Sequence, residues 1–344
     1  MSRPCPRLCP YPLQPLPAAL ASMFLLAPAL AQQPAPAPTE AETGMPEVKI
    51  EDTRVKETGY KMDRTRIGKT SQDLRDVPNS VAVVPEQLIF DRAADSLRDA
   101  LRNVAGVTFN AGEGGRIGDN ITIRGYSAVG DLFLDGMRDV AQYNREVFNL
   151  DRIEVLRGSA SMLFGRGSTG GVINQVSKTP QPFDSGTVPL TWGTDEYKRT
   201  TLDVNKAFDQ STALRLNAMY TDTDSFRDVV SNKREGAAPS VTFGLGGQNE
   251  LTLAHMYLDE KNVPDFGVPF YQGRPLEVPV ERFYGMGNAD YENNTTNIST
   301  ATYTHRFAPH TEWRTQLRYA ESSATSGPSH RGWSVRRRAS TMPR

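Results

Sequence analysis

Three runs between Asn120 and Lys178 carry the most information about this chain: N-I-T-I-R-G-Y at 120–126, D-L-F-L-D-G-M-R-D at 131–139, and R-I-E-V-L-R-G-S-A-S-M-L-F-G-R-G-S-T-G-G-V-I-N-Q-V-S-K at 152–178. Each run is rich in strand-forming residues and is broken by a glycine beside an arginine or an aspartate. This pattern predicts a compact, polar module with many turns, which differs from the apolar core of an ordinary enzyme.

Composition excludes several classes of protein. The chain has 344 residues and a formal net charge of -1, so no global field favours nucleic acid. The only cysteines, Cys5 and Cys9, lie at the extreme N-terminus, and we expect neither disulfides nor thiol chemistry in the mature chain. No apolar run reaches the roughly 18 residues that an ordinary transmembrane helix needs.

The N-terminus has the pattern of a secretory signal peptide at residues 1–31. Arg3 and Arg7 precede an apolar run at 16–30, and Ala29-Leu30-Ala31 supplies a small-residue cleavage site. A disordered N-terminal tail is the alternative. Residues 32–45 are rich in proline, alanine and acidic residues and predict a flexible linker.

Residues 46–51 form an alternating hexamer, and 46–79 as a whole is interpreted as the lead-in to the folded module. An extended strand in a flexible tail can add to the sheet edge of a partner through main-chain hydrogen bonds. A linker without function produces such alternation too, so both interpretations stay open at this point. The residues of the hexamer are Pro46, Glu47, Val48, Lys49, Ile50 and Glu51.

The region 80–180 is predicted to fold as a small α+β globule with a mixed sheet of about four main strands. Pro85 ends a first strand and begins a helical segment, and Gly106 ends a second helix. A helical turn or two is expected at 159–164. The predicted strands are 80–84, 107–110, 121–124, 132–134, 153–157 and 172–176, and the second helix is 96–103.

Beyond Pro180, seven runs alternate polar with apolar or aromatic residues, and each spans about ten residues. Short links at 208–211 and 246–248 alternate with long ones at 222–234 and 261–294. This arrangement predicts that 181–325 is part of an antiparallel transmembrane β-barrel. A soluble β-sandwich is the alternative, because it also alternates with period two. The runs are 187–192, 197–206, 211–220, 238–245, 249–259, 296–307 and 312–320.

Several motifs together resemble the plug of the TonB-dependent outer-membrane receptors: Ile123–Tyr126, Leu134–Gly136, and Val155–Gly158 followed by Gly170–Asn174. Residues 131–138, 174–178 and 257–270 resemble the ferric-catecholate siderophore receptors in particular. The resemblance implies an α+β plug domain inside a 22-stranded barrel. It also implies a monomer in the outer membrane, in contact with its lipid.

The resemblance implies partners and a mechanism as well. Residues 46–51 would be the TonB box, which TonB and its inner-membrane energising complex grip in order to remodel the plug. Arg124 and Arg157 match plug arginines that in the family face glutamates of the barrel wall. Such buried ion pairs hold a part firmly while adding little net stability. Alternatively, both arginines cap turns at the plug surface.

A ferric tris-catecholate is anionic and aromatic, so arginines and aromatic residues are expected to line its site. The siderophore itself wraps the iron, so no metal-binding residue of the protein and no other cofactor are expected. The candidate siderophore-binding residues are Arg116, Arg138, Tyr143, Phe266 and Tyr271.

The sequence matches some enzyme motifs in part, but each match lacks a feature that the motif requires. Residues 165–170 match G-x-G-x-x-G, but a strand is expected after them where a dinucleotide fold needs a helix. Gly68-Lys69-Thr70 lacks the first glycine of a P-loop, because Asp63 stands in its place. The histidines at 255, 305, 310 and 330 lack metal-ligand spacing. We therefore expect no enzyme.

Two other functional classes are alternatives to this interpretation. A sensor receptor that also signals across the envelope needs an extra N-terminal domain, and only about fourteen residues separate Ala31 from Pro46. A soluble periplasmic binding protein would pair a plug-like domain with a β-sandwich. Heat-modifiable migration in a membrane fraction would distinguish a barrel from that sandwich.

The predicted barrel is incomplete, because 22 strands need several hundred residues more. Residues 326–344 form a basic tail that departs from the alternating pattern. These two observations predict a truncated or frame-shifted product that does not transport by itself. A genuine short protein with a basic tail is the alternative.

Overall fold

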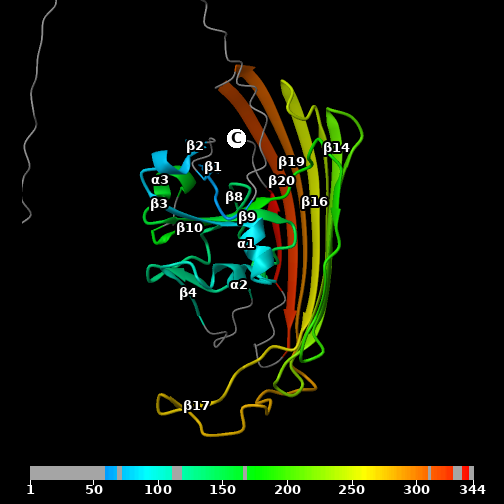
Figure 1. Ribbon diagram of the computed structural model, residues 1–344. Coiled ribbons are helices and arrows are strands. Elements are labelled where there is room, and N and C mark those ends of the chain that lie inside the picture. Colours follow the sequence, from blue (N-terminus) through cyan, green and yellow to red (C-terminus); the bar gives the residue numbers. More distant parts are fainter. Residues whose placement is uncertain are drawn as a thin grey trace, which may run out of the picture. The chain divides into compact units, whose positions relative to one another are not determined.

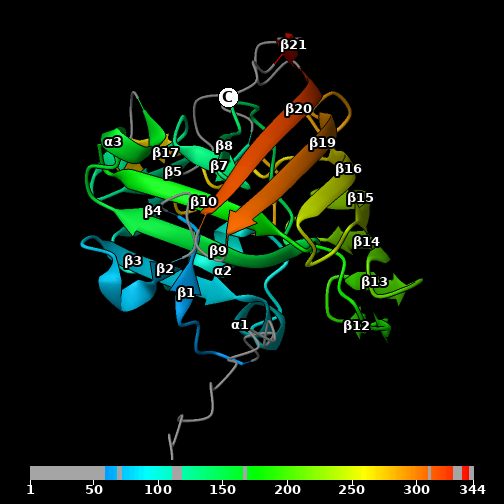
Figure 2. The same cartoon turned by 90° about the horizontal axis from the view of Figure 1, so that it is seen from above.

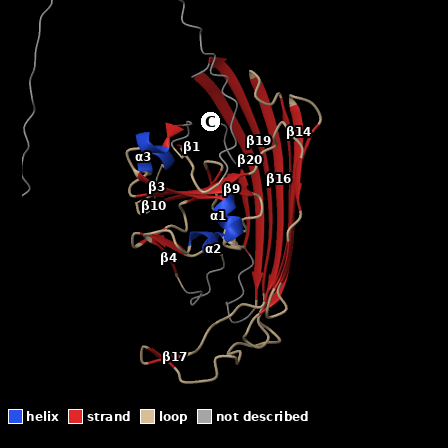
Figure 3. Ribbon diagram, in the orientation of Figure 1, coloured by secondary structure: helices blue, strands red, loops and turns tan. Residues whose placement is uncertain are grey.

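The computed structural model describes residues 59–67, 72–110, 118–165, 169–308 and 311–327, together with the backbone of 335–340. Strands dominate these residues, as Figure 3 shows. The predicted signal peptide, the linker, the TonB box and Arg116 lie outside the described residues.

The plug is built on a mixed sheet, as predicted, and this sheet has five strands where about four main strands were expected. Its order is β3-β9-β10-β7-β8; β10 pairs with β7 in parallel, and the other pairs are antiparallel. Figure 2 shows β9 and β10 crossing the middle of this sheet. The strands are β3 (Ser80–Pro85), β7 (Leu132–Leu134), β8 (Met137–Arg138), β9 (Leu150–Arg157) and β10 (Gly171–Ser177).

Three short helices accompany the sheet: α1 (Glu86–Asp91), α2 (Leu97–Leu101) and α3 (Ser161–Phe164). Pro85 is the N-cap of α1, as its fixed φ and missing N–H predict. Ser96 caps α2, because its hydroxyl accepts a hydrogen bond from the amide of Asp99. The two-residue strands β1 (Arg64–Thr65) and β2 (Gln72–Asp73) and the 3-10 turn η1 (Leu74–Asp76) precede β3.

The predicted strands at 107–110 and 121–124 are present as β4 (Val107–Phe109) and β5 (Ile121–Ile123), but they do not join the main sheet. They form a separate three-stranded sheet with β6 (Tyr126–Ser127). A two-residue turn joins β5 to β6, and in it Arg124 and Gly125 have φ of 50° and 83°. Positive φ at both central residues is the hairpin turn that folds a strand back onto its neighbour.

The L-D-G motif forms the same kind of turn. Asp135 and Gly136, with φ of 51° and 79°, join β7 to β8. The second residue of each turn is a glycine because a side chain is unfavourable at positive φ. The Arg124-Gly125 and Asp135-Gly136 pairs are thus two hairpin turns of the plug.

The G-G-V-I-N motif owes its glycines to close packing. A Cβ atom on Gly170 would lie 2.3 Å from the carbonyl oxygen of Ile123, and one on Gly171 would lie 2.3 Å from that of Leu156. No other residue fits at this distance. Asn174, four residues after Gly170, joins two further motifs, because its oxygen accepts from the amide of Gly136 and its nitrogen donates to Glu154.

The second part of the structure is one long curved antiparallel sheet, here called the wall (Figure 1). Its strand order is β11-β13-β14-β15-β16-β19-β20-β21, and β12 also pairs with β13. The small hairpin β17 (Phe270–Tyr271) and β18 (Arg274–Pro275) lies in the loop between β16 and β19. The wall strands are β11 (Ser185–Thr187), β12 (Leu190–Trp192), β13 (Lys198–Ala207), β14 (Thr212–Asp224), β15 (Ser231–Phe243), β16 (Asn249–Asn262), β19 (Glu292–Ala308), β20 (Thr311–Ser326) and β21 (Val335–Ser340).

Several wall strands have bounds that differ from the sequence prediction, and two of these differences change the interpretation of a segment. β15 begins at Ser231, so the predicted long link at 222–234 shrinks to 225–230. The polar residues 231–237 looked like loop but pair along their whole length with β14. In addition, the backbone of Val335–Ser340, within the predicted basic tail, pairs with β20 as β21.

The two faces of the wall have opposite chemistry. Large apolar side chains point away on one face, including Leu214, Leu253 and Leu317, which are 37%, 42% and 55% exposed. Arg215 and Arg318, which alternate with them, are buried on the other face. Apolar residues outside and polar residues inside is the pattern of a lipid-embedded barrel and the reverse of a soluble sandwich. None of the described helices combines the length and the hydropathy that a membrane-crossing helix requires.

Candidate functional site

The polar face of the wall meets the plug through buried ion pairs. Glu146 of the plug lies between two wall arginines: its Oε2 is 3.0 Å from Nη2 of Arg199 on β13, and its Oε1 contacts Nη1 of Arg234 on β15. The Glu146 side chain is 1% exposed. A carboxylate this deep is tolerated because two guanidinium groups compensate its charge.

A second plug acid shares one of these arginines. Asp95 lies 3.2 Å from Nε of Arg199, and the hydroxyl of Tyr197 donates to Asp95 at 2.5 Å. Burial raises the pKa of Asp95 above its ordinary value, against the opposing effect of the Arg199 charge. Plug and wall are therefore joined here by a network that includes two carboxylates and two guanidinium groups.

The D-G turn of the plug is tied to a distant wall strand. Arg318 of β20 donates to the carbonyl oxygen of Leu134 at 2.9 Å and lies 3.4 Å from Oδ2 of Asp135. Asp135 also accepts hydrogen bonds from the amide and the hydroxyl of Ser177. The Asp135 carboxylate thus fixes the hairpin, the end of β10 and the wall together.

Lys178 at the end of the plug makes a further contact. Its Nζ lies 2.9 Å from both Glu86 and Asp203, and Asp203 also receives two hydrogen bonds from Arg215. Asp203 and Arg215 belong to β13 and β14. The chain therefore enters the wall through a charged cluster that holds its first two long strands.

Apolar contacts complete this interface. Phe148 of the plug packs with Leu258 and Met219 of the wall. A Cβ atom on Gly236 of β15 would lie 3.0 Å from the Phe148 ring, so the wall has a glycine where the ring approaches.

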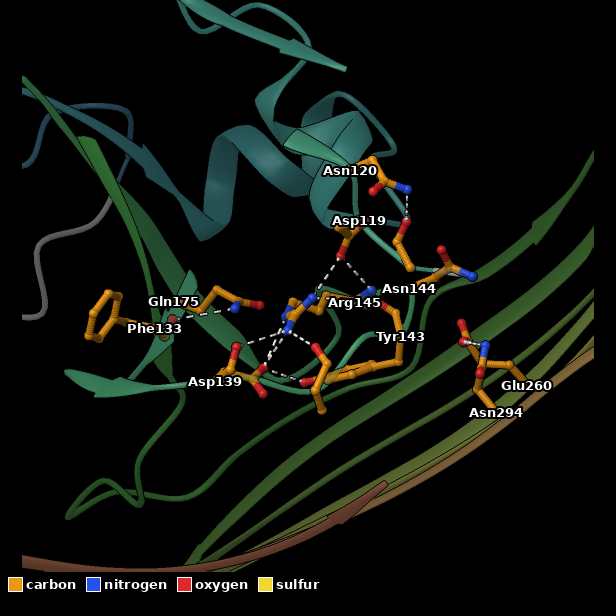
Figure 4. Close-up of polar contacts among 12 residues, drawn as sticks. Asp119, Asn120, Phe133, Asp139, Tyr143, Asn144, Arg145, Gln175, Glu260 and Asn294 are labelled. Carbon is orange, nitrogen blue, oxygen red and sulfur yellow. Dashed lines mark hydrogen bonds and ion pairs between the residues drawn. The ribbon is translucent and has the colours of Figure 1, made fainter. Parts of the chain in front are cut away.

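Arg145 organises the plug segment next to Glu146 (Figure 4). Its Nε donates to Asp139 at 3.0 Å, its Nη1 lies 3.4 Å from Asp119, and its Nη2 donates to the carbonyl oxygen of Ala141 at 2.8 Å. The guanidinium also lies over the ring of Tyr143, 4.4 Å from the centroid. Burial raises the pKa of Asp119, which the Arg145 charge opposes, and burial followed by the Asp139 charge raises the pKa of Tyr143.

Comparison with known proteins agrees with this architecture. A family model described as TonB-dependent Receptor Plug Domain matches residues 73–172. The chain belongs to the TonB-dependent receptor family. It is 36% identical over 293 residues to the probable TonB-dependent siderophore receptor PiuA of Acinetobacter baumannii, covering 82% of this chain and 39% of that protein. It is 36% identical over 271 residues to the catecholate siderophore receptor Fiu of Escherichia coli, covering 73% of this chain and 35% of that protein.

Solved structures of siderophore receptors are also similar to this chain. The crystal structure of the PiuA receptor from Acinetobacter baumannii superposes with a TM-score of 0.74 at 36% identity, over 78% of this chain and 40% of that one. The closed form of Fiu from Escherichia coli gives 0.73 at 34% identity, over the same shares. The chain thus spans about 40% of the length of these relatives. Both are named as receptors, and neither is named as an enzyme.

The two arginines predicted to lock the plug both lie against other plug residues. Arg124 packs against the position of Gly158, and Arg157 donates to the carbonyl oxygen of Ala105 and to the hydroxyl of Ser80. These hydrogen bonds of Arg157 stay within the plug. A lock with glutamates of the barrel wall therefore stays a prediction for both arginines.

The described candidate siderophore-binding residues are divided between the plug and the loop that joins β16 to β19. Tyr143 was expected in an accessible loop, but its side chain is 2% exposed and its hydroxyl donates to Asp139, so this expectation is corrected. Arg138 lies in β8, where it pairs with Asp131 and stacks on Phe133. A ligand-binding role for Arg138 stays a prediction.

Phe266 and Tyr271 lie in the long loop between β16 and β19, as expected. Phe266 contacts the ring of Phe283 at a centroid distance of 6.1 Å, and Tyr271 is 65% exposed. An exposed aromatic side chain on this loop is available to a ligand. Arg116 lies outside the described residues.

Sequence reasoning missed the acids of the plug and the arginines of the wall. A signal existed for the arginines, because Arg199, Arg215 and Arg318 occupy the same alternation phase as other polar residues of their strands. Their partners could not be identified, because each ion pair joins segments far apart in sequence. Among the described residues, no group of three or more His, Cys, Asp or Glu side chains is arranged to hold a metal ion.

Proposed function

We propose that this chain forms the plug and the first wall strands of an outer-membrane receptor that takes up ferric siderophores, with TonB as the source of energy. The observation that carries the proposal is the wall, whose outer face is apolar and whose inner face binds a polar plug through buried ion pairs. Such a wall is suited to lipid outside and to a movable domain inside.

A catecholate siderophore is the ligand class that we favour. The similarity to Fiu supports this choice, and so do the exposed aromatic residues of the β16–β19 loop, Phe270 and Tyr271. Aromatic and cationic groups suit an anionic, aromatic ferric complex. The TonB box at 46–51, the cleaved signal peptide and the monomeric state are further parts of this proposal.

Fractionation and binding test the proposal together. The 344-residue chain, expressed with its own N-terminus, is expected in the outer-membrane fraction with heat-modifiable migration. A soluble periplasmic product would support a binding protein with a β-sandwich. A ferric tris-catecholate should quench the intrinsic fluorescence of the chain, and Tyr271→Ala should weaken this binding several-fold.

Two controls sharpen this experiment. Tyr303→Ala removes an aromatic residue of similar size from wall strand β19 and should leave binding unchanged. Equal loss in both variants would contradict a binding role for the loop. The chain spans about 40% of its relatives, and we expect it to give no growth rescue in an iron-starved host. Rescue would overturn the proposal that this form does not transport.

A further inference from the structure

Three buried acceptor atoms without a hydrogen-bond partner lie together on two neighbouring wall strands. They are Oε1 of Glu260 and Oδ1 of Asn262 on β16, and Oδ1 of Asn294 on β19. Their residues are 0%, 9% and 1% exposed. Buried polar atoms of native proteins are nearly always satisfied, so a local group of unsatisfied acceptors points to a ligand that supplies positive charge or donors.

The strand register places these oxygens on one face. Glu260 lies opposite Asn294, and Asn262 lies opposite Glu292, two residues further along each strand. Residues two apart on a strand point to the same side, and Leu258 on this side packs against the plug. The four side chains therefore line the inner face of the wall on two adjacent rungs.

Hydrogen bonds hold the cluster in place. The Asn294 amide nitrogen donates to Oε2 of Glu260 and to Oε1 of Glu292, both at 3.3 Å, and Figure 4 shows the first of these bonds. The Asn144 amide of the plug donates to the same oxygen of Glu292 at 3.4 Å. With its nitrogen between the two carboxylates, Asn294 keeps its oxygen available without losing either bond.

The charge of Glu260 is not compensated by an ion pair. Its cross-strand neighbour on β15 is Arg234, whose guanidinium is instead bound to Glu146 and Asn232. No basic side chain of the described residues lies within ion-pair distance of Glu260. An ionised carboxylate out of water is costly without a compensating charge.

We propose that Glu260, Asn262 and Asn294, completed by the carboxylate of Glu292 and by water, bind a hydrated divalent cation of the Ca²⁺ type. All protein donors are carboxylate or amide oxygens, which are the ligands that Ca²⁺ uses in flexible sites of six to eight oxygens. Two of the four side chains, Asn262 and Asn294, provide amide oxygens, so the site does not need a third acidic residue. The cation would link two wall strands and, through Asn144, the plug.

Direct binding measurements on the full chain in detergent micelles test this site. Titration with CaCl2, followed by calorimetry and by thermal unfolding at constant ionic strength, should give one saturable site per chain with a dissociation constant of about 10⁻⁴ to 10⁻³ M or tighter. Glu260→Gln should weaken binding at least tenfold. Glu250→Gln, the same change at the other end of β16, should leave binding unchanged.

A second variant guards against misfolding. Asn262→Ala removes one oxygen donor at the edge of the cluster and should weaken Ca²⁺ binding several-fold without removing a charge. MgCl2 at the same concentration should bind more weakly, because Mg²⁺ demands stricter geometry and keeps its water. Absence of saturable binding in the parent, or equal binding in the parent and both cluster variants, would show that water alone satisfies these oxygens and would overturn the proposal.

Discussion

Arg199 of the wall and Glu146 of the plug form an ion pair of 3.0 Å in which the two side chains are only 8% and 1% exposed. Arg234 contacts the other oxygen of the same carboxylate. Resemblance to the family implied arginines on the plug and glutamates on the wall. At this contact the charges are reversed: the glutamate lies on the plug and the arginines lie on the wall. A buried pair of this kind adds little net stability over apolar packing, but breaking it by removing one partner is costly.

Glu146→Gln should therefore destabilise the chain by about 3 to 5 kcal/mol, because it leaves the buried Arg234 without its counter-charge and leaves Arg199 with Asp95 alone. Chemical unfolding of the protein in micelles, followed by fluorescence, measures the loss. Glu196→Gln is the matched control: Glu196 pairs with Lys198 but is 74% exposed, so its loss should be small. Equal stability of the two variants would contradict an ionic attachment between plug and wall.

Arg145→Lys should also be destabilising, although it keeps the charge. A lysine offers three donors from one point and cannot reach Asp119, Asp139 and the Ala141 carbonyl together. Each buried acceptor left unpaired costs about 1 to 3 kcal/mol. We expect a loss of at least about 2 kcal/mol in the same unfolding measurement. Arg102→Lys, at a side chain that is 69% exposed, should change little; a similar loss there would argue against the buried network.

Stability of the plug should fall as pH rises above the ordinary pKa of aspartate, 3.8, because burial raises the pKa of Asp119. Between that value and the folded pKa, the native state holds a proton that the unfolded chain has released. The stability that this bound proton contributes is complete below the ordinary pKa of aspartate. It is lost as pH rises through the pKa of Asp119 in the folded state. Unfolding free energies measured from pH 3 to 7 should decline with pH, and Asp119→Asn should flatten the decline.

Asp76→Asn serves as the control for this profile, because the Asp76 side chain is 67% exposed. Its pH profile should follow that of the parent. If Asp119→Asn and the parent have the same slope, the Asp119 carboxyl does not bind a proton in the folded state at these pH values.

Local chemistry explains why much of the fold was predictable. The turns at Arg124-Gly125 and Asp135-Gly136 follow from the need for positive φ. The wall strands follow from alternation, since one face meets lipid and the other meets the plug. Prediction failed where the structure of a segment depends on pairing with another part of the chain. Residues 231–237 are polar and resemble a loop, yet β14 supplies a pairing edge for them.

The candidate site was harder to predict than the fold. Tyr143 has the composition of a ligand-binding residue, but its contacts with Asp139 and Arg145 bury it. Glu146 carries no local signal, because its importance depends on two arginines that follow it by 53 and 88 positions. Ion pairs between the plug and the wall can be identified only when the structure of both parts is known.

The last prediction distinguishes a lipid-facing wall from a soluble sheet. Leu253 on β16 and Leu276 in the β16–β19 loop are both 42% exposed. Leu253→Arg should destabilise the chain by about 2 to 4 kcal/mol in lipid vesicles, because a charged side chain near the bilayer midplane is costly. Leu276→Arg should have little effect, since the loop is in water. Unfolding in vesicles measures both variants, and equal, small effects would mean that the outer face of the wall does not contact hydrocarbon.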